Sequence, residues 1–251
     1  MTPLRDSLDA WAAAARERLR GLSPAPTLDH VGTVAHVGDG VATVVGLPWV
    51  RADETLQFEN GALGLALHVE ENAVGCVLLG GGAVAAGSRV RGTGGIVRVP
   101  VGETLLGRVV DGTGQPLDDG APLASARHDP IERPAPAIVD RAAVTQPLMT
   151  GLTAVDAMIP LGRGQRELII GDRKTGKTAI AVDTIISQRD SDVICVYAAI
   201  GQKASTVHQV VEAVRAHGAI ERCIFVVGEA AAVPGAQWIT QIGRASCRER
   251  V

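Results

Sequence analysis

The stretch Gly171-Asp172-Arg173-Lys174-Thr175-Gly176-Lys177-Thr178 decides how the rest of this 251-residue sequence is interpreted. It fits the pattern G-x-x-x-x-G-K-[ST], which is informative when a strand precedes it and a helix follows it. The apolar run Glu167–Ile170 comes directly before the stretch, and helical periodicity runs from Lys177 to about Gln188. The stretch and its context together predict a phosphate-binding loop between a strand and a helix.

The residue types of this loop suit phosphate binding. Glycine at both ends lets the backbone wrap closely around phosphate groups, whose charge then meets exposed amides and the positive end of the following helix. We expect Lys177 to reach the terminal phosphates of ATP or ADP, and the Thr178 hydroxyl to ligate Mg²⁺. The candidate nucleotide-binding residues are Gly171, Asp172, Arg173, Lys174, Thr175, Gly176, Lys177 and Thr178. Positions between the two glycines often face solvent, so Arg173, Lys174 and Thr175 are the weaker candidates.

Helix and strand patterns alternate after the loop. The apolar runs Val193–Ile200 and Cys223–Val227 lie on either side of a helical pattern from about Ala204 to His217. Together with the run before the loop and the helix after it, the order is βαβαβ, which predicts a parallel sheet. The predicted fold class is therefore an α/β P-loop nucleotide-binding domain whose parallel sheet is incomplete.

Gln202 is a further candidate nucleotide-binding residue. It lies in Gly201-Gln202-Lys203-Ala204-Ser205, where the next predicted strand ends, and ligand sites form at the carboxyl ends of parallel strands. The alternative is an exposed polar residue at a strand end. A hydrolytic site needs a carboxylate here to take a proton from water, and an amide cannot take that proton at neutral pH. The prediction is a site that binds nucleotide and hardly turns it over.

The first part of the chain shows other patterns. Thr2–Arg20 predicts an amphipathic N-terminal helix, which either packs on the core or docks on another subunit. From about His30 to Val99, short β-branched runs punctuated by glycine predict a small antiparallel β-barrel or sandwich. The runs are His30–Val37, Gly40–Val45, Leu63–Val69, Ala73–Leu79 and Ile96–Val99. Gly107–Pro147, rich in Gly, Pro and Asp, predicts turns and an extended linker. The expected domains are 1–27 (helix and linker), 28–99 (β-barrel) and 100–240 (partial P-loop domain).

Composition narrows the class of protein. A net charge of −3 and 2% aromatic residues argue against a nucleic-acid partner, which usually meets basic fields and aromatic platforms. No run approaches the roughly 18 uninterrupted apolar residues of a spanning helix, so we expect no direct membrane insertion. The four cysteines lack metal-ligand spacing and are interpreted as reduced residues of a cytosolic protein. The only lysines are Lys174, Lys177 and Lys203, and this clustering indicates a local need for ammonium groups.

Several segments resemble the alpha subunit of F-type ATP synthases. The resemblance is carried by Gly162–Arg173, by Thr175–Thr178 and by Ile200–Ser205. Further matches are Val37–Ala42, Val99–Glu103, Leu106–Asp111 and Thr150–Asp156, so that the similarity covers nearly everything from about residue 28 to 240. The segment Glu132-Arg133-Pro134-Ala135-Pro136 is more similar to the alternate, N-type branch, whose members are linked to sodium or proton transport.

The resemblance implies a function within a larger complex. Members of the family place a β-barrel before the nucleotide domain and alternate with catalytic beta subunits around a rotating central stalk, the gamma subunit, next to a peripheral stalk. The complex lies at the cytoplasmic face of the plasma membrane. In alpha subunits the site holds Mg-ATP without turnover, and the glutamine matched here by Gln202 replaces the glutamate that activates water in beta subunits. The sequence does not distinguish proton from sodium coupling.

Two departures from the family pattern stand out. Lys174 lies where the family usually has Gln, and it either strengthens phosphate binding or points outward. The chain also stops at about half the family's length, so we expect a C-terminal truncation. The segment 241–251 resembles the translation of a sequencing-adapter oligonucleotide, and we expect it to be a non-native tail; the alternative is a basic, solvated tail.

Two other functions compete with the alpha-type subunit. The first is a self-sufficient hexameric P-loop ATPase, such as a secretion ATPase or a Rho-like helicase, which shares the barrel-plus-loop plan. A carboxylate at position 202 would favour that class, and the sequence has Gln202 instead. The second is a fragment that performs nothing, because half a nucleotide domain leaves strands unpaired and apolar surface exposed.

Overall fold

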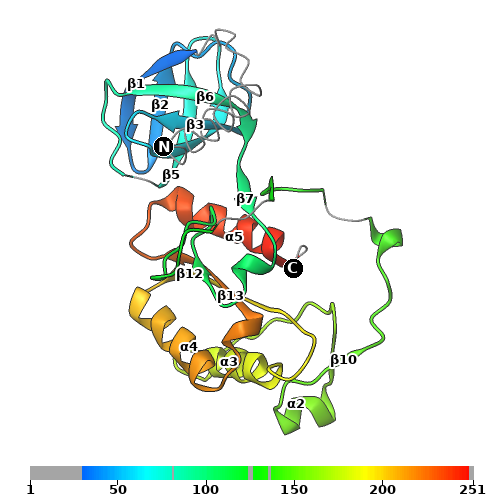
Figure 1. The fold of residues 1–251 in the computed structure, drawn as a ribbon. Coiled ribbons are helices and arrows are strands. Elements are labelled where there is room, and N and C mark those ends of the chain that lie inside the picture. The colour runs from blue at the N-terminus through cyan, green and yellow to red at the C-terminus, as the bar shows by residue number, and fades with distance from the viewer. Residues whose placement is uncertain (1–29, 81, 124–126, 135–136, 249–251) are drawn as a thin grey trace, which may run out of the picture. The chain divides into compact units, whose positions relative to one another are not determined.

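A computed structural model describes residues 30–80, 82–123, 127–134 and 137–248 (Figure 1). The fold presented below is that of the compact unit Val31–Val251. The N-terminal helix predicted at Thr2–Arg20 lies outside the described residues.

Six antiparallel strands near the start of the chain form a closed barrel, as the sequence predicts (Figure 1). They are β1 (Val31–Gly38), β2 (Val41–Val45), β3 (Glu54–Phe58), β4 (Leu63–Val69), β5 (Val74–Gly80) and β6 (Arg89–Ile96), paired in the order β1-β2-β5-β4-β3-β6. Alternate side chains point inward, so that Val34, Val44, Leu56 and Val90 are almost completely buried in one apolar core. Closure gives every strand two neighbours.

Two barrel strands, β3 and β6, were not among the predicted runs. The sequence of β3 contains Glu54 and Gln57, and β6 contains Gly92, Gly94 and Gly95, so neither shows a β-branched run. The two strands pair with each other, and the side chain of Glu54 is buried between them. The buried Glu54 carboxylate accepts hydrogen bonds from the backbone amides of Arg51 (3.1 Å) and Gly94 (2.8 Å). Gly92 of β6 leaves room for this buried carboxyl group, because a Cβ at that position would lie 2.5 Å from one of its oxygens.

The second part of the fold is a three-stranded parallel sheet in the order β12-β13-β8. Its strands are β12 (Cys195–Gln202), β13 (Cys223–Glu229) and β8 (Val109–Val110). Helices α3 (Lys177–Ser187) and α4 (Ala204–Ala216) lie together beside the sheet, and α5 (Pro234–Arg248) follows β13 (Figure 1). The parallel pairing of β12 with β13 and the bounds of α3 and α4 confirm the predicted βα alternation.

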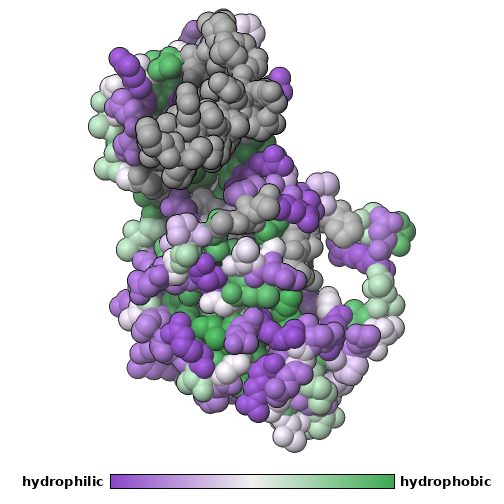
Figure 2. All heavy atoms as spheres, viewed as in Figure 1, coloured by the Kyte–Doolittle hydropathy of each residue, from purple (hydrophilic) through white to green (hydrophobic). Residues whose placement is uncertain are grey.

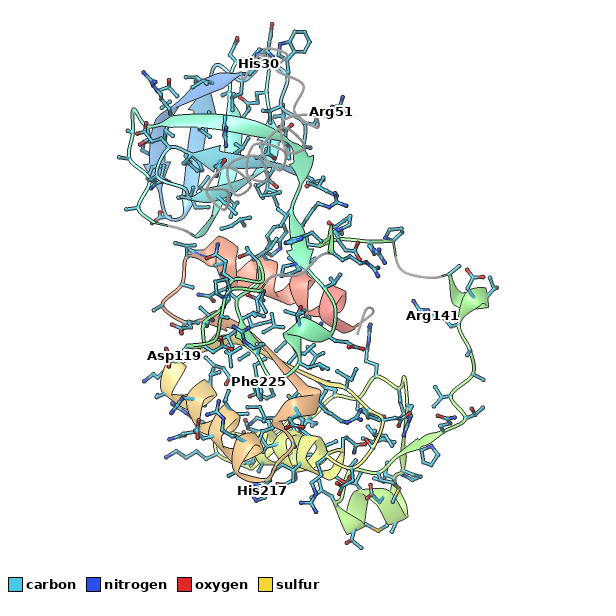
Figure 3. The ribbon with its side chains drawn as sticks, in the orientation of Figure 1. His30, Arg51, Asp119, Arg141, His217 and Phe225 are labelled. Atoms are coloured by element: carbon cyan, nitrogen blue, oxygen red, sulfur yellow. The ribbon has the colours of Figure 1, made fainter. Side chains whose placement is uncertain are left out.

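The two faces of this sheet bury different side chains. Tyr197, Phe225 and Val227 form a core with the apolar stripe of α4, and Phe225 lies inside this part of the molecule (Figure 3). The alternate residues Ile224 and Val226 pack instead against Leu105 and Val110. The near-continuous burial of β13 is typical of a parallel strand that is covered on both faces.

The strand predicted at Glu167–Ile170 is wrong. These residues form no strand, and the side chains of Leu168 and Ile170 are 79% and 80% exposed. A strand needs a neighbour for its backbone amides and carbonyls, and no described strand pairs with this segment. The third strand of the sheet is instead β8, which lies within the segment predicted as a linker.

The prediction of a plain linker at Gly107–Pro147 is therefore also wrong in part. Besides β8, the segment contains β9 (His128–Pro130), which pairs with β7 (Arg98–Pro100), a 3₁₀ helix at Ile138–Asp140 and the start of β10 (Pro147–Leu148), which pairs with β11 (Leu161–Gly162). Another 3₁₀ helix, Glu103–Leu105, precedes β8, and α2 (Thr153–Met158) follows β10. Strands of two or three residues are too short to show a periodic pattern in the sequence, so they could not be predicted from it.

Two further expectations concern the helices. The segment 241–248, expected to belong to a non-native tail, continues the helix α5 as far as Arg248. That it is non-native stays a prediction. Within the described part of the chain, no helix is both long enough and apolar enough to cross a membrane.

Candidate phosphate-binding site

The C-terminal end of α3 is fixed to the segment before α2. The Gln188 side chain, which is buried, donates a hydrogen bond of 2.6 Å to the Met149 carbonyl, and the Ser187 hydroxyl donates to the same oxygen at 3.3 Å. Gly151 has a left-handed φ of 78°, and a side chain there would lie 3.0 Å from the Ser187 hydroxyl. Only a glycine allows this close approach, which holds the far end of α3 in place.

A second set of hydrogen bonds stabilises the anchoring segment itself. Asp156 of α2 accepts hydrogen bonds from the hydroxyl (2.7 Å) and amide (2.9 Å) of Thr150 and from the amide of Gly151 (3.0 Å). The hydrogen bond from the Thr150 hydroxyl, followed by the amides, lowers the pKa of the Asp156 carboxyl. Sequence reasoning did not single out Gln188 or Asp156, because their roles depend on contacts between distant segments.

The N-terminal end of α3 has no such partner. The helix starts at Lys177 after Gly176, whose backbone is left-handed (φ 91°, ψ 8°), and no side chain caps it. No acidic residue lies in its first turn. The backbone amides and the positive end of the helix dipole are therefore not compensated by a carboxylate of the helix, which is the arrangement that favours an anion.

The loop before α3 folds back on itself. The ammonium group of Lys177 donates to the carbonyl oxygen of Gly171 (2.6 Å) and to that of Asp172. The Thr175 hydroxyl also donates to the Asp172 carbonyl, at 2.8 Å. A Cβ added at Gly171 would lie 2.7 Å from the Thr175 hydroxyl, so a larger residue would displace the Thr175 side chain. The predicted loop residues are thus brought together by contacts among themselves.

The loop is open to solvent. Of the eight residues Gly171–Thr178, all are exposed except Lys177, which is half-buried. The Thr178 hydroxyl has no hydrogen-bond partner among the described residues. One hydroxyl fits the coordination of Mg²⁺ when phosphate oxygens and water complete it, since this ion is usually held by few protein ligands. In the described part of the chain, no group of three or more His, Cys, Asp or Glu residues could hold a metal without phosphate.

Gln202 lies at the carboxyl end of β12, as predicted. It pairs with Glu229 of β13 across a local irregularity that follows Ile200, and Gly201 adopts a left-handed φ of 65°. The side-chain oxygen of Gln202 is buried and has no hydrogen-bond partner in the described structure. No hydrogen bond links Gln202 to the loop residues among those described. The side-chain oxygen of Gln202 can therefore accept a hydrogen bond from a further donor at this strand end. The residue at this position carries an amide and not a carboxylate.

A hollow of about 310 Å³ lies elsewhere, on the barrel surface. It is lined by Val31, Gln57, Phe58, Arg89 and Arg91, among others, and contains none of the candidate residues. The phosphate-binding candidate is therefore an exposed loop and not an enclosed cavity.

The fold and the loop together define a class of protein: a β-barrel followed by a P-loop nucleotide-binding domain. The chain belongs to the ATP synthase alpha/beta family. The model of the family's beta-barrel domain matches residues 28–94, and that of its nucleotide-binding domain matches residues 151–246, which together is more than half of the chain. The resemblance seen in the sequence is confirmed.

Proteins named as alpha subunits are similar to the chain over most of its length. It is 50% identical over 248 residues to ATP synthase subunit alpha 2 of Gluconobacter oxydans, and the aligned region covers 98% of this chain and 49% of that protein. It is 54% identical over 232 residues to ATP synthase subunit alpha 1 of Paraburkholderia xenovorans, which covers 92% and 46%. The chain spans about half the length of the curated relatives it matches.

Proposed function

We propose that the chain is an alpha-type subunit of a rotary ATP synthase that binds ATP or ADP at Gly171–Thr178 without hydrolysing it. The observation that carries the proposal is the loop itself: an uncapped helix start, a lysine turned into the loop and an exposed hydroxyl, all within eight residues. These are the groups that a chain of phosphates requires.

Each loop residue has a role in this proposal. The backbone of Gly171–Gly176 surrounds the phosphates, and Lys177 provides a point charge that can leave the carbonyls of Gly171 and Asp172 for a phosphate oxygen. Thr178 supplies one ligand to Mg²⁺, which, when bound, neutralises part of the phosphate charge. The anchored C-terminal end of α3 keeps the open N-terminal end in position.

The absence of turnover is proposed from Gln202. Hydrolysis requires a group that accepts a proton from the attacking water, and the amide at the end of β12 cannot do so at neutral pH. A self-sufficient ATPase would need a carboxylate in this place. The non-catalytic chain would instead regulate neighbouring catalytic beta subunits, next to gamma and peripheral-stalk subunits, at the cytoplasmic face of the membrane. We also propose the domain division 28–99 and 100–240.

The test is nucleotide binding and turnover by the chain alone and with a catalytic beta subunit. We expect Mg²⁺-dependent ATP binding with negligible hydrolysis by the chain alone, and hydrolysis only with the beta subunit. Lys177→Ala should weaken ATP binding by about 100-fold or more, since it removes a charge-assisted contact inside the loop. Thr178→Ala should bind ATP with little dependence on Mg²⁺. Vigorous hydrolysis by the lone chain would contradict the role given to Gln202.

A further inference from the structure

Lys174 is the feature of the loop that the proposed function does not yet use. It has a left-handed φ of 68°, which is uncommon for a residue other than Gly, Asn or Asp. Such backbone strain persists mainly where the surrounding structure requires it, often at ligand sites. Gly176, two residues further on, is also left-handed (φ 91°), and turns that contain left-handed residues can form concavities of backbone amides that attract anions.

The charges of the loop are not compensated. Lys174 and Arg173 are exposed, and neither has an ion-pair partner within the described residues. Asp172, the one acidic residue of the loop, uses its carbonyl oxygen to accept from Lys177 and Thr175, and none of the described ion pairs includes its carboxylate. Three cations and one carboxylate in eight residues give the loop a net charge that a polyphosphate would neutralise.

The two lysines of the loop differ in their free hydrogen-bonding capacity. The Lys177 ammonium has three donors, and two of them are bonded to the Gly171 and Asp172 carbonyls. Lys174 makes no hydrogen bond with its side chain in the described structure. Its ammonium can therefore meet a phosphate oxygen without first breaking a contact of the loop.

We infer that Lys174 is a second phosphate-contacting cation and that it makes the site prefer a triphosphate to a diphosphate. A triphosphate carries one more negative charge than a diphosphate, and a compact ammonium on a flexible chain can follow the longer phosphate chain. This inference rests on the proposed function, because it assumes that Gly171–Thr178 binds the phosphates. It adds a specificity determinant to that site.

The experiment measures dissociation constants of the full chain for ATP, ADP, inorganic tripolyphosphate and pyrophosphate. Lys174→Gln removes the charge while keeping most of the chain length. We expect it to weaken the binding of ATP and tripolyphosphate about 10-fold, which is the effect of losing one charge-assisted contact. The binding of ADP and pyrophosphate should weaken about threefold or less. The dependence of ATP affinity on salt should also decrease. The base-free probes separate phosphate contacts from contacts to adenosine.

Two further variants separate charge from backbone. Lys174→Gly removes the ammonium and also relieves the left-handed strain, so it should bind ATP as weakly as Lys174→Gln. Arg215→Gln removes a cation from an exposed position on α4, outside the candidate site, and should alter each affinity less than twofold. If Lys174→Gly bound ATP like the unchanged chain, or if Arg215→Gln caused an equal loss, the inference would be wrong.

Failure of the inference can be distinguished from failure of the proposed function. If the unchanged chain binds ATP, Lys177→Ala does not, and Lys174→Gln keeps the ratio of ATP to ADP affinity, then only the inference falls. If the unchanged chain binds none of the four probes, both fall together.

Discussion

The barrel has no edge strand, whereas the parallel sheet has open edges. Each of the six barrel strands has two hydrogen-bonded neighbours, whereas β12 of the three-stranded sheet has only β13. Large apolar side chains are exposed in both parts, with Trp49 at 72% in the barrel and Met158, Ile159, Leu168 and Ile170 at 69–80% after it. Figure 2 shows hydrophobic residues at the surface of this part of the molecule, between hydrophilic ones.

The difference bears on the stability of the two parts and on the position of the candidate site. A closed barrel leaves no edge for other chains and needs no ligand to complete it. The candidate phosphate-binding loop lies instead in the part with an open edge, and its hydrogen bonds are few and local. Regions with few buried contacts open at low free energy, and binding sites are often drawn from them.

The largest expected effect comes from large-to-small substitutions in the two cores. Phe225 is completely buried and its ring lies 6.0 Å from that of Tyr197, while Leu56 is completely buried in the barrel. We expect Phe225→Ala to lower the free energy of unfolding by about 3–5 kcal/mol and Leu56→Ala by about 2–5 kcal/mol. Denaturant titration measures both values.

Hydrogen exchange would then show whether the two regions are independent. With Phe225→Ala, exchange should accelerate in β12, β13 and α4 and stay slow in β1 to β5. With Leu56→Ala, the pattern should reverse. Equal acceleration everywhere in both variants would mean that the barrel and the sheet unfold as one unit, and the comparison would lose its basis.

A smaller effect is expected at Arg108 and Asp118, beside the short strand β8. The Arg108 guanidinium donates two hydrogen bonds to Asp118, of 2.6 and 2.8 Å, and the amide of Val109 donates a third, of 2.9 Å. The hydrogen bond from Arg108 is the main reason why the pKa of Asp118 is lowered to about 2. The pair thus fixes the strand that completes the sheet.

The lowered pKa links this pair to pH. Because the folded pKa lies below the ordinary value, the stabilisation is present above about pH 4 and is lost as the pH falls towards 2. The shift corresponds to about 2 kcal/mol at neutral pH. Asp118→Asn should therefore cost about 2 kcal/mol at pH 7, and the difference from the unchanged chain should shrink between pH 4 and pH 2. Asp119→Asn, at an exposed neighbouring position, serves as the control.

The sequence predicts local elements better than pairings. The loop at Gly171–Thr178 and the helix α3 follow from a spaced motif and from helical periodicity, and both are present. The barrel strands with β-branched runs were also predicted. Strand β6 was not, because Gly92 makes room for the buried carboxyl group of Glu54 and the amide of Gly94 donates to it. That requirement comes from a residue about 40 positions earlier and leaves no periodic signal.

The sheet shows the same limit more clearly. The run Glu167–Ile170 is apolar enough for a buried strand, but a strand exists only where a neighbour pairs with it. The two residues of β8 are too few to be noticed, yet they pair with β13. Within the site, the anchoring of Gln188 to Met149 depends on contacts across about 40 residues of chain and could not be found from spacing.

The smallest expected effect tests directly whether Glu167–Ile170 is an exposed segment and not a strand. Since Leu168 and Ile170 are 79% and 80% exposed, the double change Leu168→Ser and Ile170→Ser should alter the free energy of unfolding by no more than about 0.5 kcal/mol. The control is Ile224→Ser, at a completely buried position in β13, which should cost several times more. Chemical denaturation of the three proteins measures both changes. A loss of about 2 kcal/mol or more from the double change would mean that Glu167–Ile170 is packed as a strand, as its sequence predicts. The sheet would then have a fourth strand beside the loop, and the contrast with the closed barrel would largely disappear.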